Sequence, residues 1–355
     1  MTKYIIRRLI QSIPTLFGIT VIAYLIIYLA PGSIATQLFL DPELNQRQRA
    51  AMMDALGLND PFPVQYARWL LGDVPIQIFG VTVWQGREMP VFDRRGNQTG
   101  TLPGTAEGVI RFDFGRSLVS KQDALEVIGN HVGATLELGW LALAVGLLVG
   151  IPVGVLAAVW QGSWFDQITR ILSVVVSSIP VFWLGIVLLL IFGSWLQWLP
   201  MGGRFPTTIS GEYTAWERIS RLILPTFTLA SFTIATYSRF MRASLLEVLN
   251  QDYIRTAYSK GLSNRKVWFG HALRNALIPI ATLLGPSLTL VITGAVLTET
   301  IYSWPGMGRL LVNSVNQQDY PIIMAIIILV AIATVIGYII SDVLYAVFDP
   351  RVRLS

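Results

Sequence analysis

Residues 138–165, LGWLALAVGLLVGIPVGVLAAVWQGSWF, contain no Asp, Glu, Lys or Arg. A transmembrane helix needs about 20 consecutive apolar residues, so this run is long enough to cross a bilayer. Inside lipid there is no water to hydrogen-bond the backbone, and an apolar run of this length therefore favours a helix over an open strand. The stretch predicts a membrane-spanning helix.

Five further uncharged windows repeat this pattern along the chain. Only 13% of the 355 residues are charged, about half the usual fraction of roughly 25%. A soluble protein would have to bury six all-apolar helices in one small core, so we predict an all-α polytopic membrane protein with six transmembrane helices. The other windows are Leu9–Ala30, Ile171–Gly203, Leu222–Ser238, Asn275–Thr298 and Pro321–Ser341.

The distribution of Lys and Arg predicts the orientation. With both termini inside, the short inside segments hold thirteen of these residues and the two short outside loops hold four. The loop between the first two spans holds the other nine, but long loops translocate largely regardless of charge. We therefore expect a multi-pass inner (plasma) membrane protein with both termini cytoplasmic. The pI of about 9.5 reflects this topology and gives no support for nucleic-acid binding.

The first two spans bound a large external segment. Residues 1–30 should hold a cytoplasmic start and a retained first span, because an uncharged run of 22 residues exceeds the 7–15 of a signal peptide. A structureless loop as long as 31–134 is uncommon, so we expect a soluble extracytoplasmic α/β insertion there, with a simple spacer as the alternative. It should contain a helix ending at Gly57, a helix over Val64–Leu71, and a hairpin or three-stranded element with turns at Gln85-Gly86 and Arg95-Gly96-Asn97.

The motifs of ATPases and common membrane enzymes are missing from the chain. There is no G-x-x-x-x-G-K-[ST] motif, so the chain binds no ATP through a P-loop. Its two histidines, His131 and His271, lack metal-ligand spacing, it has no cysteine, and no nucleophile elbow or H-E-x-x-H motif occurs. We expect a non-enzyme with no catalytic residue, no metal site and no cofactor bound by this chain.

The spans also lack the ionisable residues that ion-coupled carriers place within the membrane. The nearest charges, Glu137, Arg239, Glu299 and Asp342, stand at window edges. We interpret them as interface and topology charges. Energy for transport should therefore come from a partner that docks on a cytoplasmic surface.

The longest cytoplasmic loop offers such a surface. No Gly or Pro occurs from Thr236 to Lys260, so the fourth span should continue as one helix beyond the membrane. Gly261 can end that helix in a left-handed conformation, and Ser263 can cap the next one. The loop predicts a protruding helix and a glycine corner, although its basic charge could also serve only to orient the protein. One face of the helix should carry Phe240, Leu245, Leu249, Tyr253 and Ala257.

The segment 255–279, RTAYSKGLSNRKVWFGHALRNALIP, resembles the cytoplasmic EAA loop of ABC-importer permeases of the dipeptide/oligopeptide/nickel branch. Arg255-Thr256-Ala257 stand at the E-A-A positions and Gly261 at the glycine. The proline of the general motif is delayed to Pro279, a departure typical of this branch. The stretches RASLLEVLNQDYIRTA, ETIYSWPGMGRLL and DPRVR are also similar to the branch, whereas 72–111 looks like an extra insertion.

The resemblance implies a type I ABC-importer permease (MetI-like) core over 135–348, with a coupling loop at 243–276 and a cytoplasmic tail at 349–355. It also implies three kinds of partner besides membrane lipid: a second homologous permease, two ATP-binding-cassette ATPase subunits that carry ATP and Mg, and an extracytoplasmic substrate-binding protein. The residues expected to couple to the ATPase are Arg255, Thr256, Ala257, Tyr258, Lys260, Gly261, Leu262 and Ser263.

The resemblance further implies import of di- or oligopeptides, with nickel chelates or oligosaccharides as alternatives. Peptide is preferred because no His, Cys or acidic cluster suggests metal handling. A stand-alone channel or carrier, or a receptor without transport, remains a separate hypothesis. Candidate residues of the translocation path, each of which could equally make interhelical hydrogen bonds, are Ser177, Ser178, Thr233, Thr236, Thr289 and Thr293.

Overall fold

The computed structural model describes residues 2–29, 46–55, 57–79, 81–86, 88–92, 98–206, 213–293 and 295–348. The expected tail at 349–355 and the turn at 95–97 lie outside the described residues. The chain divides into two compact units. We call residues 1–12, 131–312 and 330–355 the bundle unit, and residues 13–130 and 313–329 the cap unit.

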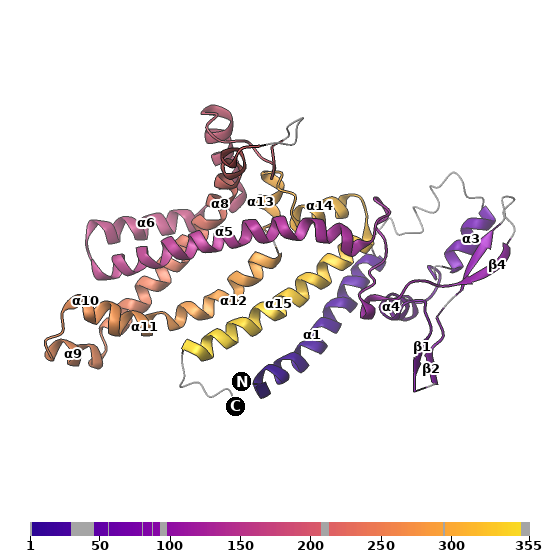
Figure 1. The fold of residues 1–355 in the computed structure, drawn as a ribbon, viewed down its shortest axis with the longest axis horizontal. Helices are drawn as coiled ribbons and strands as arrows, with labels where there is room; N and C mark the ends of the chain where they lie inside the picture. The colour runs from indigo at the N-terminus through magenta and orange to yellow at the C-terminus, as the bar shows by residue number, and fades with distance from the viewer. Residues whose placement is uncertain are drawn as a thin grey trace. The chain divides into compact units, whose positions relative to one another are not determined.

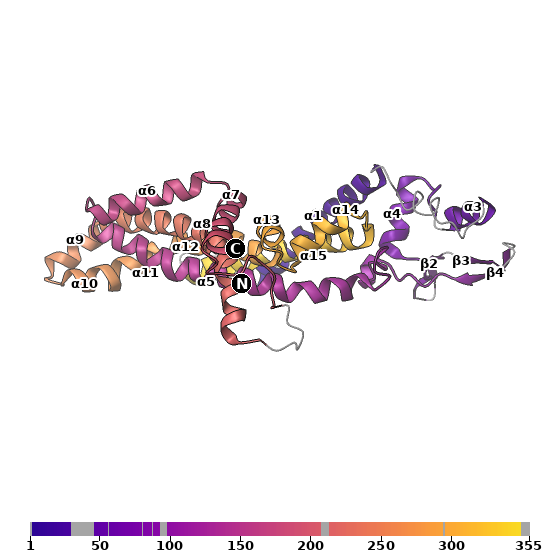
Figure 2. The same ribbon diagram turned by 90° about the horizontal axis from the view of Figure 1, so that it is seen from above.

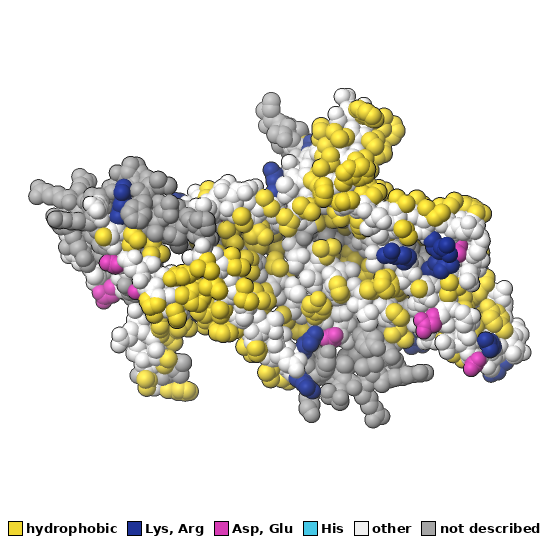
Figure 3. Space-filling model, turned by 180° about the vertical axis from the view of Figure 1, so that it is seen from behind, with side chains coloured by type: hydrophobic (Ala, Val, Ile, Leu, Met, Phe, Trp, Pro, Cys, Tyr) yellow, Lys and Arg dark blue, Asp and Glu magenta, His cyan; other side chains and the backbone are white. Residues whose placement is uncertain are grey.

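Helices make up most of the described chain (Figure 1). Five segments are long and apolar enough to cross a membrane: Ile6–Leu29, Ala124–Val159, Ala215–Leu249, Ile278–Ile301 and Tyr320–Val343. They correspond to α1 (Thr2–Leu29), α5 (Ala124–Val159), α8 (Ala215–Leu249), α12 (Ile278–Thr293) with α13 (Val296–Ile301), and α15 (Tyr320–Phe348). Hydrophobic side chains cover much of the face in Figure 3, as lipid contact requires.

The third expected span is bent. It consists of α6 (Trp164–Ser178), α7 (Val181–Leu188) and the π-helical η2 (Leu189–Trp195), with an angle of 101° between the two halves. Pro180 explains the break, because it restricts Ile179 to the extended conformation observed there (φ −87°, ψ 129°). The described residues reach the six predicted spans when this bent pair is counted as one span.

Close backbone contact joins α5 to α8 in the bundle unit. Gly146, Gly150 and Gly154 recur every fourth residue on α5, and a Cβ added at Gly154 would lie 2.5 Å from the carbonyl oxygen of Ser238. Small residues at this spacing let membrane helices approach closely, which improves van der Waals packing where no hydrophobic effect drives association. This stripe of glycines therefore fixes which face of α8 lies against α5.

A buried ion pair joins α6 to α8, which lie side by side (Figure 2). The Arg242 guanidinium donates to both carboxylate oxygens of Asp166, at 2.5 and 2.8 Å. The Asp166 side chain is 1% exposed, so this bidentate bond satisfies a charge that water does not reach. One turn away along α8, the hydroxyls of Ser173 and Ser238 lie 3.2 Å apart.

The cap unit combines helices with two hairpins. After α3 (Gln46–Ala55), Gly57 has φ +67° and its N–H donates to Asp54 O at 3.0 Å, which confirms the predicted helix stop. The predicted second helix is confirmed as α4 (Phe62–Leu71), which begins two residues early. A short 3₁₀ turn, η1 (Val109–Arg111), follows the hairpins.

The predicted small β element is present as two separate antiparallel pairs. β1 (Ile76–Ile78) pairs with β2 (Val81–Trp84), and β3 (Glu88–Phe92) pairs with β4 (Gln98–Pro103). The predicted turn at Gln85-Gly86 therefore joins the two hairpins and does not close either of them.

Candidate functional site

The loop between the fourth and fifth spans, which was predicted to be cytoplasmic, contains a helix break that the sequence analysis missed. α8 ends at Leu249, and α9 (Asp252–Ser259) begins after Gln251, which is extended (φ −76°, ψ 150°). The predicted continuous helix over 236–260 is therefore wrong. Asn250 explains the break, because its side-chain amide donates to Leu246 O at 3.0 Å and competes with the helical hydrogen bonds.

The break changes which residues of the loop are buried. The predicted apolar face is confirmed in part: Leu245 and Ala257 are buried, whereas Phe240 and Tyr253 are 46% and 44% exposed. The two non-helical residues between α8 and α9 shift the phase, so that Ile254 is buried together with Ala257. They pack in one apolar cluster with Leu245 and residues of the following helices.

Gly261 makes the predicted corner. It has φ +76°, its N–H donates to Tyr258 O at 2.9 Å, and the N–H of Leu262 donates to Ala257 O at 3.4 Å. This pair of bonds is a Schellman motif, which satisfies the last carbonyls of a helix. Leu262 packs against the apolar cluster beneath, so the corner holds α9 in one orientation.

The next helical stretch begins at the predicted place. Ser263 is extended and precedes α10 (Asn264–Lys266), but its side chain makes no capping hydrogen bond. The π-helical η3 (Val267–Ala272) and α11 (Leu273–Ala276) follow and lead into α12. The N-cap position is right, and the predicted side-chain cap is absent.

The eight predicted coupling residues fall into two groups. Ala257 is buried and Leu262 half-buried, so these two anchor the corner to the bundle unit. The other six are exposed and form what we call the α9 surface: Arg255, Thr256, Tyr258, Lys260, Gly261 and Ser263.

Side-chain hydrogen bonds join α9 to the helices that lie beneath the α9 surface. The Ser244 hydroxyl donates to Ala276 O at 2.9 Å, which joins α8 to α11. The Asn275 amide donates to the Tyr253 hydroxyl at 2.8 Å, which joins α11 to α9. Because α8 is in turn bonded to α6, a chain of hydrogen bonds connects α9 through α11 and α8 to α6.

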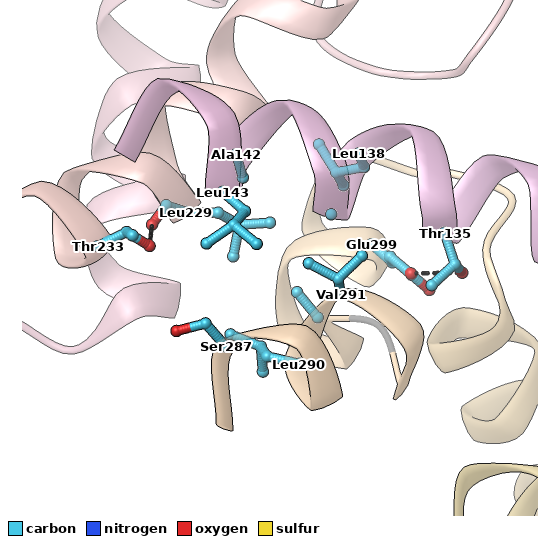
Figure 4. Close-up of a pocket in the computed structure, with 12 residues that line it drawn as sticks. Thr135, Leu138, Ala142, Leu143, Leu229, Thr233, Ser287, Leu290, Val291 and Glu299 are labelled. Atoms are coloured by element: carbon cyan, nitrogen blue, oxygen red, sulfur yellow. Dashed lines mark hydrogen bonds between the residues drawn. The ribbon is translucent and has the colours of Figure 1, made fainter. Parts of the chain in front are cut away.

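A small cavity lies deeper in the bundle unit (Figure 4). It measures about 40 Å³, and its lining is mostly aliphatic, with polar groups from Thr135, Thr233, Ser287 and Glu299. A polar cavity of this size has room for water, which needs about 10–15 Å³ and several polar partners. The Tyr237 and Ser287 hydroxyls lie 2.9 Å apart, so α8 and α12 are bonded at this level.

Only one of the six candidate path residues, Thr233, lines this cavity. Ser177 and Ser178 donate to carbonyls of their own helix, Ser173 O and Val174 O, and Thr289 donates to Gly285 O. Thr236 and Thr293 are half-buried away from it. Thr135, Ser287 and Glu299 were missed because they lie on three helices whose packing the sequence does not specify.

The interpretation of Glu299 as an interface charge is wrong, because its side chain is fully buried. One carboxylate oxygen accepts the Thr135 hydroxyl at 2.9 Å (Figure 4). The other accepts the Arg309 N–H at 3.0 Å. A Cβ at Gly306 would lie 2.3 Å from the Glu299 carboxyl carbon. The glycines of ETIYSWPGMGRLL thus let the backbone pass close to this carboxylate. This motif was the sequence feature that could have predicted the burial of Glu299.

Another edge charge pairs at the surface of the bundle unit. Glu137 accepts hydrogen bonds from Arg204 at 2.8 Å and from Arg218. Its side chain is 26% exposed, in keeping with a boundary position. Among the described residues, no group of three or more His, Cys, Asp or Glu could hold a metal ion.

Comparisons with known proteins cover nearly the whole chain. Residues 150–354 match the family model of the binding-protein-dependent transport system inner membrane component, and residues 1–82 match the model of its N-terminal region. The first of these segments contains α6 to α15 and the α9 surface, and the second contains α1, α3 and α4.

Curated relatives align from end to end. The chain is 38% identical over 354 residues to the oligopeptide transport system permease protein AppB of Bacillus subtilis, covering 99% of this chain and all of the relative. It is 33% identical over 372 residues to the dipeptide transport system permease protein DppB of Escherichia coli K12, covering 99% of each. It is also 33% identical over 353 residues to the glutathione transport system permease protein GsiC of Salmonella paratyphi A, again covering 99% of each.

Proposed function

The chain belongs to the family of binding-protein-dependent transport system inner membrane components, and we propose that it is the permease subunit of an ATP-driven importer of di- and oligopeptides. It is a multi-pass inner membrane protein and a transport subunit, as its relatives are. We place both termini in the cytoplasm on the Lys and Arg distribution.

The observation that carries the mechanism is the α9 surface. It is exposed, held by the Schellman motif at Gly261, and bonded through α8 and α11 to the membrane helices. The sequence contains no P-loop, so the ATPase must be a separate chain. We propose that α9 is the coupling helix and that closure of the ATPase subunits moves it as a lever. This is a rigid-body switch biased by ATP, which binds the two states unequally.

The remaining partners follow from this assembly. We propose that a second, homologous permease completes the path, that two ATPase subunits bind ATP and Mg, and that an extracytoplasmic binding protein delivers the substrate. The polar side chains at the bundle cavity, Thr135, Thr233 and Ser287, would belong to the wall of the path. Peptide is the preferred substrate because the relatives carry oligopeptide, dipeptide and glutathione permease names.

Reconstitution of the complete importer tests the proposal. The whole complex with its binding protein, in proteoliposomes, should take up radiolabelled dipeptide only with ATP, and free nickel or an oligosaccharide should not compete. Uptake by this chain alone, without ATP, would instead establish a channel or carrier. Competition by a nickel chelate would retain the importer and change the substrate.

A matched pair of tyrosine variants tests the docking surface. Tyr258, in α9, is 40% exposed, and Tyr213, before α8, is 46% exposed. Tyr258→Ala should reduce co-purification of the ATPase subunits severalfold, while Tyr213→Ala should not. Equal recovery of the ATPase with both variants would contradict docking at α9.

A further inference from the structure

A helix of the cap unit packs along the outer half of the first membrane-spanning helix (Figure 1). The rings of Phe62 and Tyr28 lie 5.4 Å apart, and those of Trp69 and Tyr24 lie 5.2 Å apart. Phe62 and Trp69 lie in α4, whereas Tyr24 and Tyr28 lie in α1. The contact therefore extends along a stripe of α1 and is not confined to its end.

One hydrogen bond sets the depth of α4. The hydroxyls of Tyr66 and Thr20 lie 2.7 Å apart and are buried. Thr20 precedes Leu29, the last residue of α1, by nine positions, which is about 13 Å along a helix. A helix tilt of about 40° would reduce that depth to about 10 Å. Half of the hydrocarbon core is about 15 Å thick, so the middle of α4 lies within the outer leaflet.

The charge of α4 is compatible with that depth. Its one charged residue is Arg68, whose side chain is 11% exposed. Arg68 lies 2.8 Å from a carboxylate oxygen of Asp73 and 3.8 Å from one of Asp60. The cation is thus paired and shielded, and the large hydrophobic side chain that α4 exposes is Val64, at 42%.

The β1–β2 hairpin is attached to the end of α4 and is apolar. The indole N–H of Trp84 donates to Gly72 O at 2.8 Å, which fixes the base of the hairpin. Residues 74–86 contain no Asp, Glu, Lys or Arg. Phe79 at the tip is fully exposed, and Val81 and Val83 are 66% and 63% exposed. Exposure of these three apolar side chains to water is unfavourable, so the tip of this hairpin favours an apolar cover.

We propose that α4 and the β1–β2 hairpin are embedded in the outer leaflet and that phospholipid acyl chains cover the hairpin tip. The face of α1 turned away from α4 is apolar and exposed, with Ile22 and Ile26 60% and 63% exposed, as a helix in contact with lipid requires. On the hairpin, Trp84 has the amphipathic ring that favours the membrane interface. The cap unit is then partly an interfacial element and not wholly a soluble cap.

A cavity of the cap unit beside α4 also favours lipid as the molecule that covers this region. It measures about 430 Å³ and is lined mainly by aromatic and aliphatic side chains, including Tyr24, Trp69, Tyr320 and Met324. Tyr320 is the first residue of α15, so this cavity lies at the outer end of a span. The mainly apolar lining suits an acyl chain as its occupant.

The second hairpin provides the contrast. In β3–β4 the Thr101 hydroxyl donates to the Glu88 carboxylate at 2.5 Å, and the strands carry Gln98, Thr99 and Thr101. Transfer of these polar groups from water into an apolar environment would cost free energy. We therefore place β3–β4 in the aqueous phase.

The absence of cysteine from the chain allows a direct test. Single variants Phe79→Cys, Thr99→Cys and Ile26→Cys would be labelled with the polarity-sensitive fluorophore NBD in the full importer complex, reconstituted in phosphatidylcholine nanodiscs. NBD at 79 should match NBD at 26, with blue-shifted emission and severalfold stronger quenching by shallow spin-labelled lipid than by aqueous iodide. NBD at 99 should show the reverse preference.

Two results would overturn the proposal. Quenching of position 79 by iodide as strong as at 99 would place the hairpin in water. Shielding of 79 only after the substrate-binding protein is added would assign the tip to a protein partner. Val81→Cys repeats the measurement if the label at 79 disturbs the turn. Uptake activity is not part of this readout, so its outcome is independent of the proposed transport function.

Discussion

Substitutions at Gly261 distinguish the effect of backbone conformation at the corner from the effect of a side chain added to its surface. The variants are Gly261→Asn, Gly261→Ala and Gly261→Val. Gly261 has φ +76°, and a Cβ built on it would meet no heavy atom within 4 Å. A side chain therefore fits in the isolated chain, and the expected cost lies in the backbone alone.

The left-handed conformation costs an L-residue roughly 1–2 kcal/mol, and asparagine tolerates it better than alanine. A cost of about 1 kcal/mol changes a conformational equilibrium by about fivefold, and about 2 kcal/mol by about thirtyfold. The α9 orientation is stabilised by the two Schellman bonds and by Leu262. We expect peptide uptake to fall in the order Asn, Ala, Val, with Ala lowered by at least about fivefold if coupling requires the corner.

The assay measures ATP-dependent peptide uptake and ATP hydrolysis on the same proteoliposomes. Hydrolysis should persist while uptake falls, because the catalytic sites are on other chains. Gly270→Ala is the matched control in the same loop, since Gly270 also has open space at Cβ but no positive φ. It should retain full uptake.

The order of the variants decides between two causes. Backbone strain predicts that Asn is better tolerated than Ala, whereas steric exclusion by the ATPase predicts the opposite because Asn is larger. If Ala outperforms Asn, or if all three variants transport normally, the strained-corner reasoning is refuted.

Three further outcomes are expected from thermal unfolding of the purified complex. Asp166→Asn should lower the free energy of unfolding by about 3 kcal/mol, because it removes the buried carboxylate that pairs with Arg242. The double variant with Arg242→Met should lose less stability than the two single variants together, and additive losses would contradict this. Gly154→Ala should lower the midpoint by overpacking, whereas Gly133→Ala on the same helix, with nothing within 4 Å, should leave it unchanged or raise it. Glu299→Gln should cost about 1–3 kcal/mol because one amide oxygen replaces the two carboxylate oxygens that accept the Thr135 hydroxyl and the Arg309 N–H; an unchanged midpoint would show that the carboxylate is not needed.

Local features of the chain were predictable to different degrees. The helix stop at Gly261 follows from one residue and its own backbone, and the sequence analysis located it correctly. The break at Asn250 was missed because asparagine weakens a helix without forbidding it, and the surrounding residues favour helix. That missed break also shifted the phase of α9, so that Tyr253 is exposed and Ile254 is buried together with Ala257.

The candidate path residues were the least predictable part of the site. Serine and threonine within a membrane helix can satisfy their hydroxyls on their own backbone, as Ser177 and Thr289 do. Whether such a side chain faces a cavity depends on the rotation of its helix against its neighbours. The sequence determines this rotation only through the packing of whole helices. An apolar helix can pack against its neighbours in many rotations about its axis.

The amino-acid sequence by itself determined the membrane-spanning character, the sites of the helices and the exposed corner, because hydropathy, proline and glycine act over a few neighbouring residues. Only the tertiary structure decided the burial of Glu299, since its hydroxyl partner Thr135 is 164 residues away. The same holds for Tyr66, whose bond to Thr20 brings a segment of the external loop against a membrane helix. A buried polar group must find its partner wherever packing places one, and that distance along the chain leaves no local signal.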